Sequence, residues 1–287
     1  MLKSQPVPAP TRCGTTEFRW GERTYVMGVC NLSPESFSGD GLGNDIEAVV
    51  AQAQRFIADG ADIIDVGGES TRPGIDPRAI DDTDAELELV IPAIERLVNE
   101  ITVPISIDTY KSAVASRAVT AGASMINDIW GLKRDPGIAR VAAETGVPII
   151  LMGNQRDAPP HTGIMARVIS DLERSISLAR EAGVPEENII VDPGTGFGKS
   201  LEQNLEIVNR LAELKRLGKP ILLGTSRKSM IGLVLDLPPE QRVEGTAATV
   251  AIGIANGADM VRVHDVKEMV RVCRMSDAII RRGKISD

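Results

Sequence analysis

Charged and amide side chains stand at the ends of several apolar runs in this sequence. Asp108, Asn127 and Asp192 each come where such a run stops, and Lys228 follows the run 221–223 within a few residues. Two carboxylates and an amide can match a flat heterocycle that carries an amino group, a ring N–H and a carbonyl, and a lysine can donate to it. Each Asp or Asn alone has a simpler interpretation as the cap of the next helix. Together they predict a heterocycle site.

A second set of polar residues has the chemistry of an anion site. Arg262 and His264 follow the last apolar run and Asn31 follows the first, so the three would be neighbours in a closed barrel. Arginine makes bidentate contacts with phosphate, and barrels often bind phosphate near their last two strands. A lone histidine is more often a packing residue, but His264 shares a strand end with Arg262. His161, in a polar loop, is given no role.

Eight mainly apolar runs position these residues, and helical patterns separate them. The runs are 25–30, 62–66, 103–107, 124–126, 147–151, 189–191, 221–223 and 259–261. The helical patterns are 45–60, 84–99, 111–121, 137–145, 168–182, 201–217, 246–255 and 266–282, with a loop at 235–240. Continuous apolar runs alternating with helices predict a parallel sheet, and this number of units predicts an α/β fold of the (β/α)8 TIM-barrel type. Its active site would lie at the carboxyl ends of the strands.

The remaining parts of the chain are assigned around this barrel. Residues 1–13 carry Pro6, Pro8 and Pro10 and are predicted to be a flexible tail, and residues 14–287 a single domain. Residues 16–20 and 24–26 alternate around a turn signal at 21–22, which predicts a short hairpin before the first barrel strand. The glycine-rich segments 31–43 and 67–74 are expected to be loops that close over the barrel mouth. The segment 194–198 lacks GxGxxG spacing and is interpreted as a tight loop.

The bulk composition excludes several classes of protein. The chain has 287 residues, of which 43% are hydrophobic and 25% charged, and its net charge of −8 without a basic run argues against nucleic acid as a partner. No apolar run reaches membrane-spanning length, and the start lacks the apolar core of a signal peptide. Cys13, Cys30 and Cys273 lie far apart, which indicates neither disulfides nor a zinc site. We therefore expect a cytoplasmic enzyme without membrane contact.

The chain resembles the dihydropteroate synthases from about residue 25 to residue 280. The segments that carry the resemblance are MGVCNLSPESFS (27–38), GGESTRPG (67–74), SIDTYK (106–111), INDIWG (126–131), DPGTGFGK (192–199), LGTSRKS (223–229), GTAAT (245–249) and VRVHD (261–265). So many motifs in one order make the resemblance specific.

The resemblance implies a reaction. It is the condensation of 7,8-dihydropterin-6-ylmethyl diphosphate with 4-aminobenzoate, which gives dihydropteroate and diphosphate for folate synthesis. It also implies a TIM barrel, magnesium as cofactor, sensitivity to sulfonamides and a homodimer.

The resemblance also implies roles for individual residues. Asp108, Asn127, Asp192 and Lys228 would hold the pterin, with Arg262 against its face. Asn31, Arg262 and His264, with magnesium, would hold the diphosphate, and Asn31 is the expected metal ligand. The residues expected to shape the aminobenzoate pocket are Phe37, Thr71, Pro73, Phe197 and Ser229, and Arg72 is expected to bind substrate.

The chain departs from the family pattern in two places. The first loop has Glu35 where the family usually has Asp, and Gly39-Asp40 where it usually has Asp-Gly. Gly153 stands where the family usually has His. These departures leave a second interpretation open, a paralogue that keeps the pterin and anion pockets with weak or no synthase activity. A third, a pterin-dependent methyltransferase, is disfavoured because such enzymes have no diphosphate for Arg262 and His264 to hold.

Overall fold

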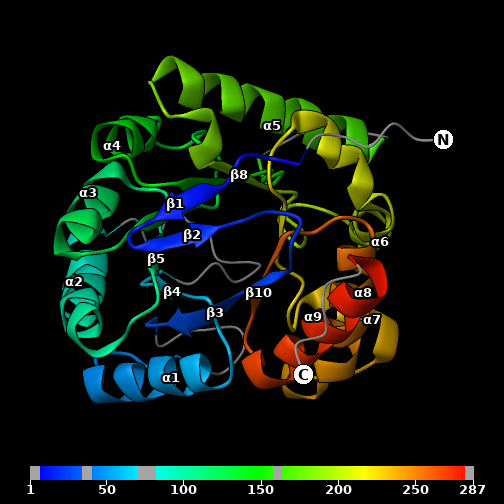
Figure 1. Cartoon of the computed structure of the whole chain (residues 1–287), viewed down its shortest axis with the longest axis horizontal. Helices are drawn as coiled ribbons and strands as arrows, with labels where there is room; N and C mark the ends of the chain where they lie inside the picture. Colours follow the sequence, from blue (N-terminus) through cyan, green and yellow to red (C-terminus); the bar gives the residue numbers. More distant parts are fainter. Residues whose placement is uncertain (1–6, 34–40, 70–81, 158–162, 282–287) are drawn as a thin grey trace.

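The computed structural model describes residues 7–33, 41–69, 82–157 and 163–281. Within them, eight parallel strands form one sheet in the order β8-β7-β6-β5-β4-β3-β10-β9. A bridge between Val191 and Ile221, with the Val191 amide donating to the Pro220 carbonyl at 3.0 Å, joins the two edges of the sheet. The sheet is therefore a closed barrel, and helices surround it (Figure 1). This confirms the predicted (β/α)8 fold.

The strands and helices alternate through the chain. The barrel strands are β3 (Tyr25–Asn31), β4 (Ile63–Gly67), β5 (Ile105–Asp108), β6 (Met125–Asp128), β7 (Ile149–Met152), β8 (Ile189–Asp192), β9 (Leu222–Leu223) and β10 (Met260–Val263). The helices are α1 (Ile46–Ala58), α2 (Thr83–Glu100), α3 (Ser112–Ala121), α4 (Gly137–Thr145), α5 (Ile164–Glu181), α6 (Leu201–Asn209), α7 (Ser229–Leu235), α8 (Val243–Ala255) and α9 (Val266–Ile280).

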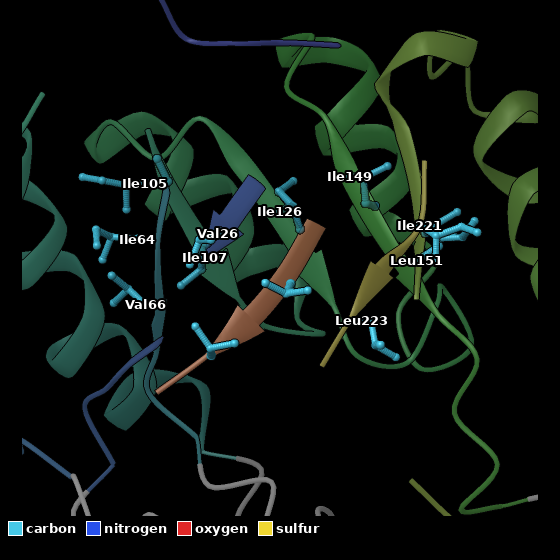
Figure 2. Close-up of a cluster of buried hydrophobic side chains, with 14 of the residues drawn as sticks. Val26, Ile64, Val66, Ile105, Ile107, Ile126, Ile149, Leu151, Ile221 and Leu223 are labelled. Carbon is cyan, nitrogen blue, oxygen red and sulfur yellow. The ribbon is translucent and has the colours of Figure 1, made fainter. Parts of the chain in front are cut away.

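The two-residue repeat of the strands separates two apolar cores. Side chains such as Ile64, Ile126 and Val261 point outward and pack against the helices, in the layer that Figure 2 shows around the barrel. Their neighbours Ile63, Met125 and Met260 point inward and fill the amino-terminal end of the lumen. On β4, β6, β8 and β10 the next inward position, two residues further along the strand, carries a polar side chain: Asp65, Asn127, Asp192 and Arg262. An apolar base therefore lies beneath a polar layer at the strand carboxyl ends.

The hairpin covers the amino-terminal end of the barrel. Strand β1 (Thr11–Cys13) pairs antiparallel with β2 (Thr16–Phe18), and Gly14 in the turn has φ 59°, a value that favours glycine. Cys13 and Phe18 are fully buried against the inward-facing residues of the barrel strands. The predicted hairpin exists, but its position was wrong: the turn lies at residues 14–15, and 24–26 begins barrel strand β3.

The predicted tail was also placed too far along the chain. Thr11–Cys13 is a buried strand, because Thr11 receives the indole N–H of Trp20 at 2.9 Å and Cys13 enters the barrel base. Residues 1–6 lie outside the described residues, so a flexible tail there stays a prediction. The three cysteines are buried free thiols, as expected.

Several predicted helix boundaries differ from the observed ones. Helix α1 begins at Ile46, after its cap Asp45, whose side chain accepts from the Ala48 amide, and it ends at Ala58, two residues before the predicted end. The pattern 201–217 is broken at Arg210 into α6 and the 3-10 helix Leu211–Leu217. Helix α7 was missed, because its seven residues, SMIGLVL, are too few to show a helical repeat. In the part of the chain that is described, no helix has both the length and the apolar character needed to cross a bilayer.

Gly28 tests the packing of helices on the barrel. A Cβ at this position would lie 2.8 Å from Phe56 Cδ2 in α1 and 3.2 Å from a Val266 methyl in α9. We expect Gly28→Ala to lower the free energy of unfolding by about 1–3 kcal/mol through overpacking. The double variant Gly28→Ala, Phe56→Leu should recover part of that loss, measured by urea denaturation. Additive losses in the double variant would contradict this account.

Candidate active site

Arg262 is the central charge of the barrel lumen. Its Nε donates to Asp65 Oδ2 at 2.6 Å and its Nη2 donates to Asp108 Oδ2 at 2.7 Å, so one guanidinium bridges carboxylates on β4 and β5. Because β10 pairs with β3, β3 with β4 and β4 with β5, Arg262 reaches past one strand to Asp65 and past two to Asp108. The two carboxylates raise the pKa of Arg262 above its usual range despite burial, which alone would lower it. The guanidinium is therefore held as a cation.

Asp65 links this ion pair to the predicted heterocycle site. Its Oδ2 also accepts from Asn127 Nδ2 at 3.2 Å, and the Asp65 side chain is fully buried. Among the described residues, its other oxygen, Oδ1, has no hydrogen-bond partner. Asp65 was not predicted as a site residue, because it lies inside an apolar run and not at its end. Asp65 is two residues from both Ile63 and Gly67, so the three share the inward face of β4. This spacing is the sequence signal that could have identified it.

Burial changes the proton affinity of Asp108. Desolvation raises the pKa of Asp108 to about 7, against the lowering effect of Arg262, and the nearby Asp65 carboxylate raises it further. Two carboxylates thus compete for one guanidinium. A partner that donates hydrogen bonds to Asp108 would stabilise its ionised form, which is what the amino group and ring N–H of a pterin offer.

Asp192 and Lys228 form the opposite part of the lumen. A Cβ at Gly224 would lie 3.8 Å from Lys228 Nζ and 3.9 Å from Asp192 Oδ2. Both groups therefore lie close to the backbone just after β9, where glycine has no side chain. Lys228 Nζ donates to the Thr195 carbonyl at 2.6 Å, and Asp192 Oδ1 accepts from the Gly194 amide at 2.6 Å. Desolvation lowers the pKa of Lys228 to about 8 and raises that of Asp192, while their mutual attraction opposes both shifts.

Phe197 lies beside this pair. Lys228 Nζ is 4.8 Å and Arg156 Cζ 4.7 Å from the centre of its ring, and the ring is buried in a cluster with Tyr110, Trp130 and Met152. Ser229 is exposed at the first residue of α7, next to Lys228. The structure therefore brings Phe197 and Lys228 together.

Lys199, which was not predicted, holds the loop that carries Phe197. Its Nζ donates to the carbonyls of Gly153 at 2.7 Å, Gly194 at 2.7 Å and Phe197 at 3.1 Å. Three acceptors match the three N–H donors of an ammonium group. Burial lowers the pKa of Lys199 to about 7, and the Asp192 carboxylate counteracts this. No spacing rule in the sequence distinguishes this lysine from a surface lysine.

Asn31 and His264 stand on the other side of Arg262. Asn31 follows Met27 and Val29 on the inward face of β3, and it pairs with Gly67 of β4. The His264 amide and Nδ1 both contact Ser226 Oγ, at 3.1 and 2.9 Å, and the imidazole is buried. Ser226 thereby orients the imidazole. Because β3 pairs with β10, the strand that ends at Asn31 lies beside the strand that carries Arg262 and precedes His264.

These features can be compared with known proteins. The model of the family described as pterin binding enzyme matches residues 27–264. A dihydropteroate synthase from Clostridium beijerinckii is 53% identical over 272 residues, which cover 94% of this chain and 100% of the relative. This chain belongs to the dihydropteroate synthase family.

Solved structures agree with this family assignment. A dihydropteroate synthase from Clostridium difficile, crystallised in the presence of pteroic acid, superposes with a TM-score of 0.86 at 48% identity, covering 92% of this chain and 99% of the other. A Xanthomonas albilineans dihydropteroate synthase with 4-aminobenzoic acid gives a TM-score of 0.87 at 40% identity, covering 96% and 98%. The two chains share this barrel over nearly their whole lengths.

Some predicted residues of this synthase-family chain cannot be placed. Phe37, Thr71, Arg72 and Pro73 lie outside the described residues, as do the altered first-loop positions 35, 39 and 40 and His161. Gly153, where the family usually has His, is described and packs tightly. A Cβ there would lie 3.3 Å from both the Pro193 carbonyl oxygen and a Val168 methyl. Asp128, in the INDIWG segment, accepts from the Trp130 and Leu132 amides at 2.8 and 2.6 Å and shapes the loop after β6.

The Asp108 carboxylate gives a first prediction for this site. Because the pKa of Asp108 is raised in the folded chain, ionisation of this carboxyl lowers the free energy of unfolding. The loss grows as the pH rises from about 4 to about 7 and is complete above pH 7. Asp108→Asn removes the cost and keeps an acceptor for Arg262. We expect pterin affinity to fall about a hundredfold or more, while the melting temperature relative to the parent chain improves between pH 5 and pH 8. An equal destabilisation at both pH values would contradict the raised pKa.

Lys199 gives a second prediction. Lys199→Met keeps a similar length but leaves three carbonyls without their donor, so the loop that carries Phe197 should shift. We expect the KM for 4-aminobenzoate to rise about tenfold with little change in pterin affinity, because a displacement of about 1 Å at a site is enough for such losses. Lys267→Met, at an exposed position on α9, is the matched control. Equal losses for both substrates would indicate general destabilisation instead of positioning.

Proposed function

We propose that this chain is a dihydropteroate synthase that condenses 7,8-dihydropterin-6-ylmethyl diphosphate with 4-aminobenzoate, as part of folate synthesis. The observation that carries the proposal is the polar layer of the lumen. Asp108, Asn127 and Asp192 offer acceptors and Lys228 a donor around one opening, the complement of a pterin's polar edge. Family membership and the shared barrel support the same function.

The reaction needs charge placement more than a strong base. Breaking the C–O bond to diphosphate leaves a pterin-methyl cation, the nitrogen of 4-aminobenzoate forms the new C–N bond, and the amine releases a proton. Asp108, Asn127, Asp192 and Lys228 hold the ring, and Arg262 packs against its face. The buried carboxylates Asp65 and Asp108 lie where positive charge develops, so they would stabilise the cation electrostatically.

Asn31, Arg262 and His264 would assist the departure of the diphosphate. Magnesium prefers oxygen ligands and usually combines few protein oxygens with substrate phosphates and water. No group of three His, Cys, Asp or Glu that could hold a metal is found among the described residues. The amide oxygen of Asn31 fits a site completed by diphosphate, and magnesium bound there would neutralise the leaving group. Arg262 and His264 would contact the remaining phosphate oxygens.

The aminobenzoate pocket would lie against Phe197 and Ser229, with Phe37, Thr71, Arg72 and Pro73 contributing from the first two loops. A sulfonamide has the same aromatic amine as 4-aminobenzoate and would compete for this pocket. One relative, from Yersinia pestis, was solved as a sulfonamide drug complex, and it superposes with a TM-score of 0.88 at 37% identity over 94% of this chain. We further propose that the enzyme works in the cytoplasm, with small-molecule substrates and no nucleic-acid or membrane partner.

Turnover of the two substrates is the direct test of the proposed reaction. We expect dihydropteroate and diphosphate to form in equal amounts in the presence of magnesium. A sulfonamide should inhibit competitively with 4-aminobenzoate. Tight binding of both substrates without any product would overturn the proposed activity while leaving the pterin site intact.

Two substitutions separate the anion site from the pterin site. His264→Ala should weaken binding of the pterin diphosphate about tenfold or more and leave the pterin alcohol unchanged, because the alcohol carries no anion. Arg262→Ala should weaken both ligands, since it leaves Asp65 and Asp108 without their counter-ion. Calorimetric titration of both ligands measures these effects. If His264→Ala weakened the binding of both ligands equally, His264 would not be part of the anion site.

We also propose that the chain forms a homodimer through α7, α8 and α9. Leu233 in α7, Met275 and Ile279 in α9 are 67%, 63% and 67% exposed, and Ile252 adds an apolar side chain on α8. The helices α8 and α9 lie side by side (Figure 1). An apolar face of this kind is self-complementary around a two-fold axis, which suits a second copy of the chain.

The oligomeric state in solution tests this face. Met275→Asp combined with Ile279→Asp should produce monomers, because two charges would be buried without partners on each side of the interface. Leu205→Asp, at an exposed apolar position on α6, is the control and should leave the dimer intact. Sedimentation velocity distinguishes the two masses. A parent chain that sediments as a monomer would overturn the proposal.

A further inference from the structure

We propose that the protein has a second small-molecule site, outside the barrel lumen, that binds an organic anion. A cavity of about 520 Å³ lies between the loop after β6, the start of the loop after β7 and helix α5. This volume is within the range of small-molecule pockets. None of the residues proposed to hold pterin, diphosphate or aminobenzoate lines it.

One face of α5 forms the wall of this cavity. Arg167, Asp171, Arg174 and Leu178 are spaced by four, three and four residues, so their side chains lie along one stripe of the helix. Lys133 and Arg134 face them from the loop after β6. The cavity is therefore built by two rigidly connected segments.

The lining has an excess of positive charge in an acidic chain. Four cationic side chains (Lys133, Arg134, Arg167, Arg174) face two carboxylates (Asp157, Asp171), a net excess of two, although the whole chain has a net charge of −8. Both carboxylates are already engaged. Asp171 accepts from Lys133 Nζ at 2.5 Å and from Gln155 Nε2 at 2.9 Å, and Asp157 accepts from Arg134 Nη2 at 3.1 Å.

The remaining hydrogen-bond capacity is on the donor side. The Trp130 indole N–H and Arg134 Nε are buried, and neither has an acceptor within the described ranges. Arg174 makes no hydrogen bond or ion pair with any residue that the structure describes, and Arg167 uses only Nε, toward the amide oxygen of Gln155 at 3.2 Å. Buried donors are nearly always satisfied, so Trp130 Nε1 and Arg134 Nε call for an acceptor from a ligand, while Arg167 and Arg174 are exposed and add charged donors along the cavity lining. A carboxylate or phosphate supplies it.

The cavity also has an apolar part. Leu132 and Leu178 line it together with Pro136 and the Trp130 ring, on which the Arg134 guanidinium lies at 4.1 Å. An inorganic ion would leave this part unfilled. The geometry thus points to a small organic molecule with one or two carboxylate or phosphate groups.

The same loop connects this cavity to the lumen. The Gln155 amide donates to the Phe197 carbonyl at 3.1 Å, and Arg156 covers the Phe197 ring. A ligand against Gln155 therefore contacts the segment that supports the proposed aminobenzoate pocket. Occupation of the cavity should change the KM for 4-aminobenzoate more than that for the pterin substrate.

Trp130 provides a reporter for the test. The chain has two tryptophans, so Trp20→Phe leaves Trp130 as the only one. Phthalate, an aromatic dicarboxylate, and glycerol 2-phosphate, an organic phosphate, are titrated separately while Trp130 emission is recorded. We expect a saturable change with at least one probe, and the stronger probe identifies the preferred anion. If Trp20→Phe fails to fold, the melting temperature of the parent chain with each probe replaces emission.

Three variants decide where the anion binds. Arg174→Gln should weaken the response about tenfold or more, because it removes a charged donor. Arg140→Gln, an exposed α4 residue outside the cavity, removes the same charge and should have no effect. His264→Ala, in the lumen, should also have no effect. No saturable response to either probe at tens of millimolar, or a response lost in His264→Ala and kept in Arg174→Gln, would overturn the proposal.

Discussion

Arg262, held between two buried carboxylates, is the interaction on which the rest of the lumen depends. A carboxylate in a closed barrel loses its water, and the cost is several kcal/mol unless a counter-ion and hydrogen bonds replace that water. Arg262 compensates Asp65 and Asp108 at once, and Asp65 in turn receives Asn127. The proposed pterin contacts and the proposed anion contacts therefore share Arg262, and a change at Arg262 alters the electrostatics of both.

The alternation of strand residues explains how one barrel provides both a stable core and a polar site. Inward positions are mostly apolar at the amino-terminal ends of the strands, where the hairpin seals them, and on β4, β6, β8 and β10 they are polar two residues later. Met260 and Arg262 on β10, like Met125 and Asn127 on β6, show this pattern within single strands. The apolar base keeps the polar layer in place, so the site rests on strand ends and not on loops alone.

This pattern also explains what the sequence could predict. Residues that end an apolar run, such as Asp108, Asn127 and Asp192, were identified because the run and its end are visible in the order of residues. Asp65 was missed because it lies within an apolar run. Only its spacing of two residues from Ile63 indicates that its side chain faces inward. Lys199 was missed because its role depends on three carbonyls that the loop brings together in space. Contacts between segments far apart in the chain carry no local sequence signal, whereas strand periodicity does.

Charge balance sets a final constraint on the proposed chemistry. The lumen holds three carboxylates, Asp65, Asp108 and Asp192, and three cationic side chains, Arg262, Lys228 and Lys199. Among these described groups the charges cancel, so the lumen offers a diphosphate directed hydrogen bonds but no net positive charge. A divalent cation that arrives with the diphosphate would supply the missing charge without disturbing the ion pairs below it. An added protein cation at the same depth would repel the pterin-methyl cation and so offset the stabilisation that the buried carboxylates give it. A dissociable metal at the mouth, above a neutral polar layer, meets both requirements.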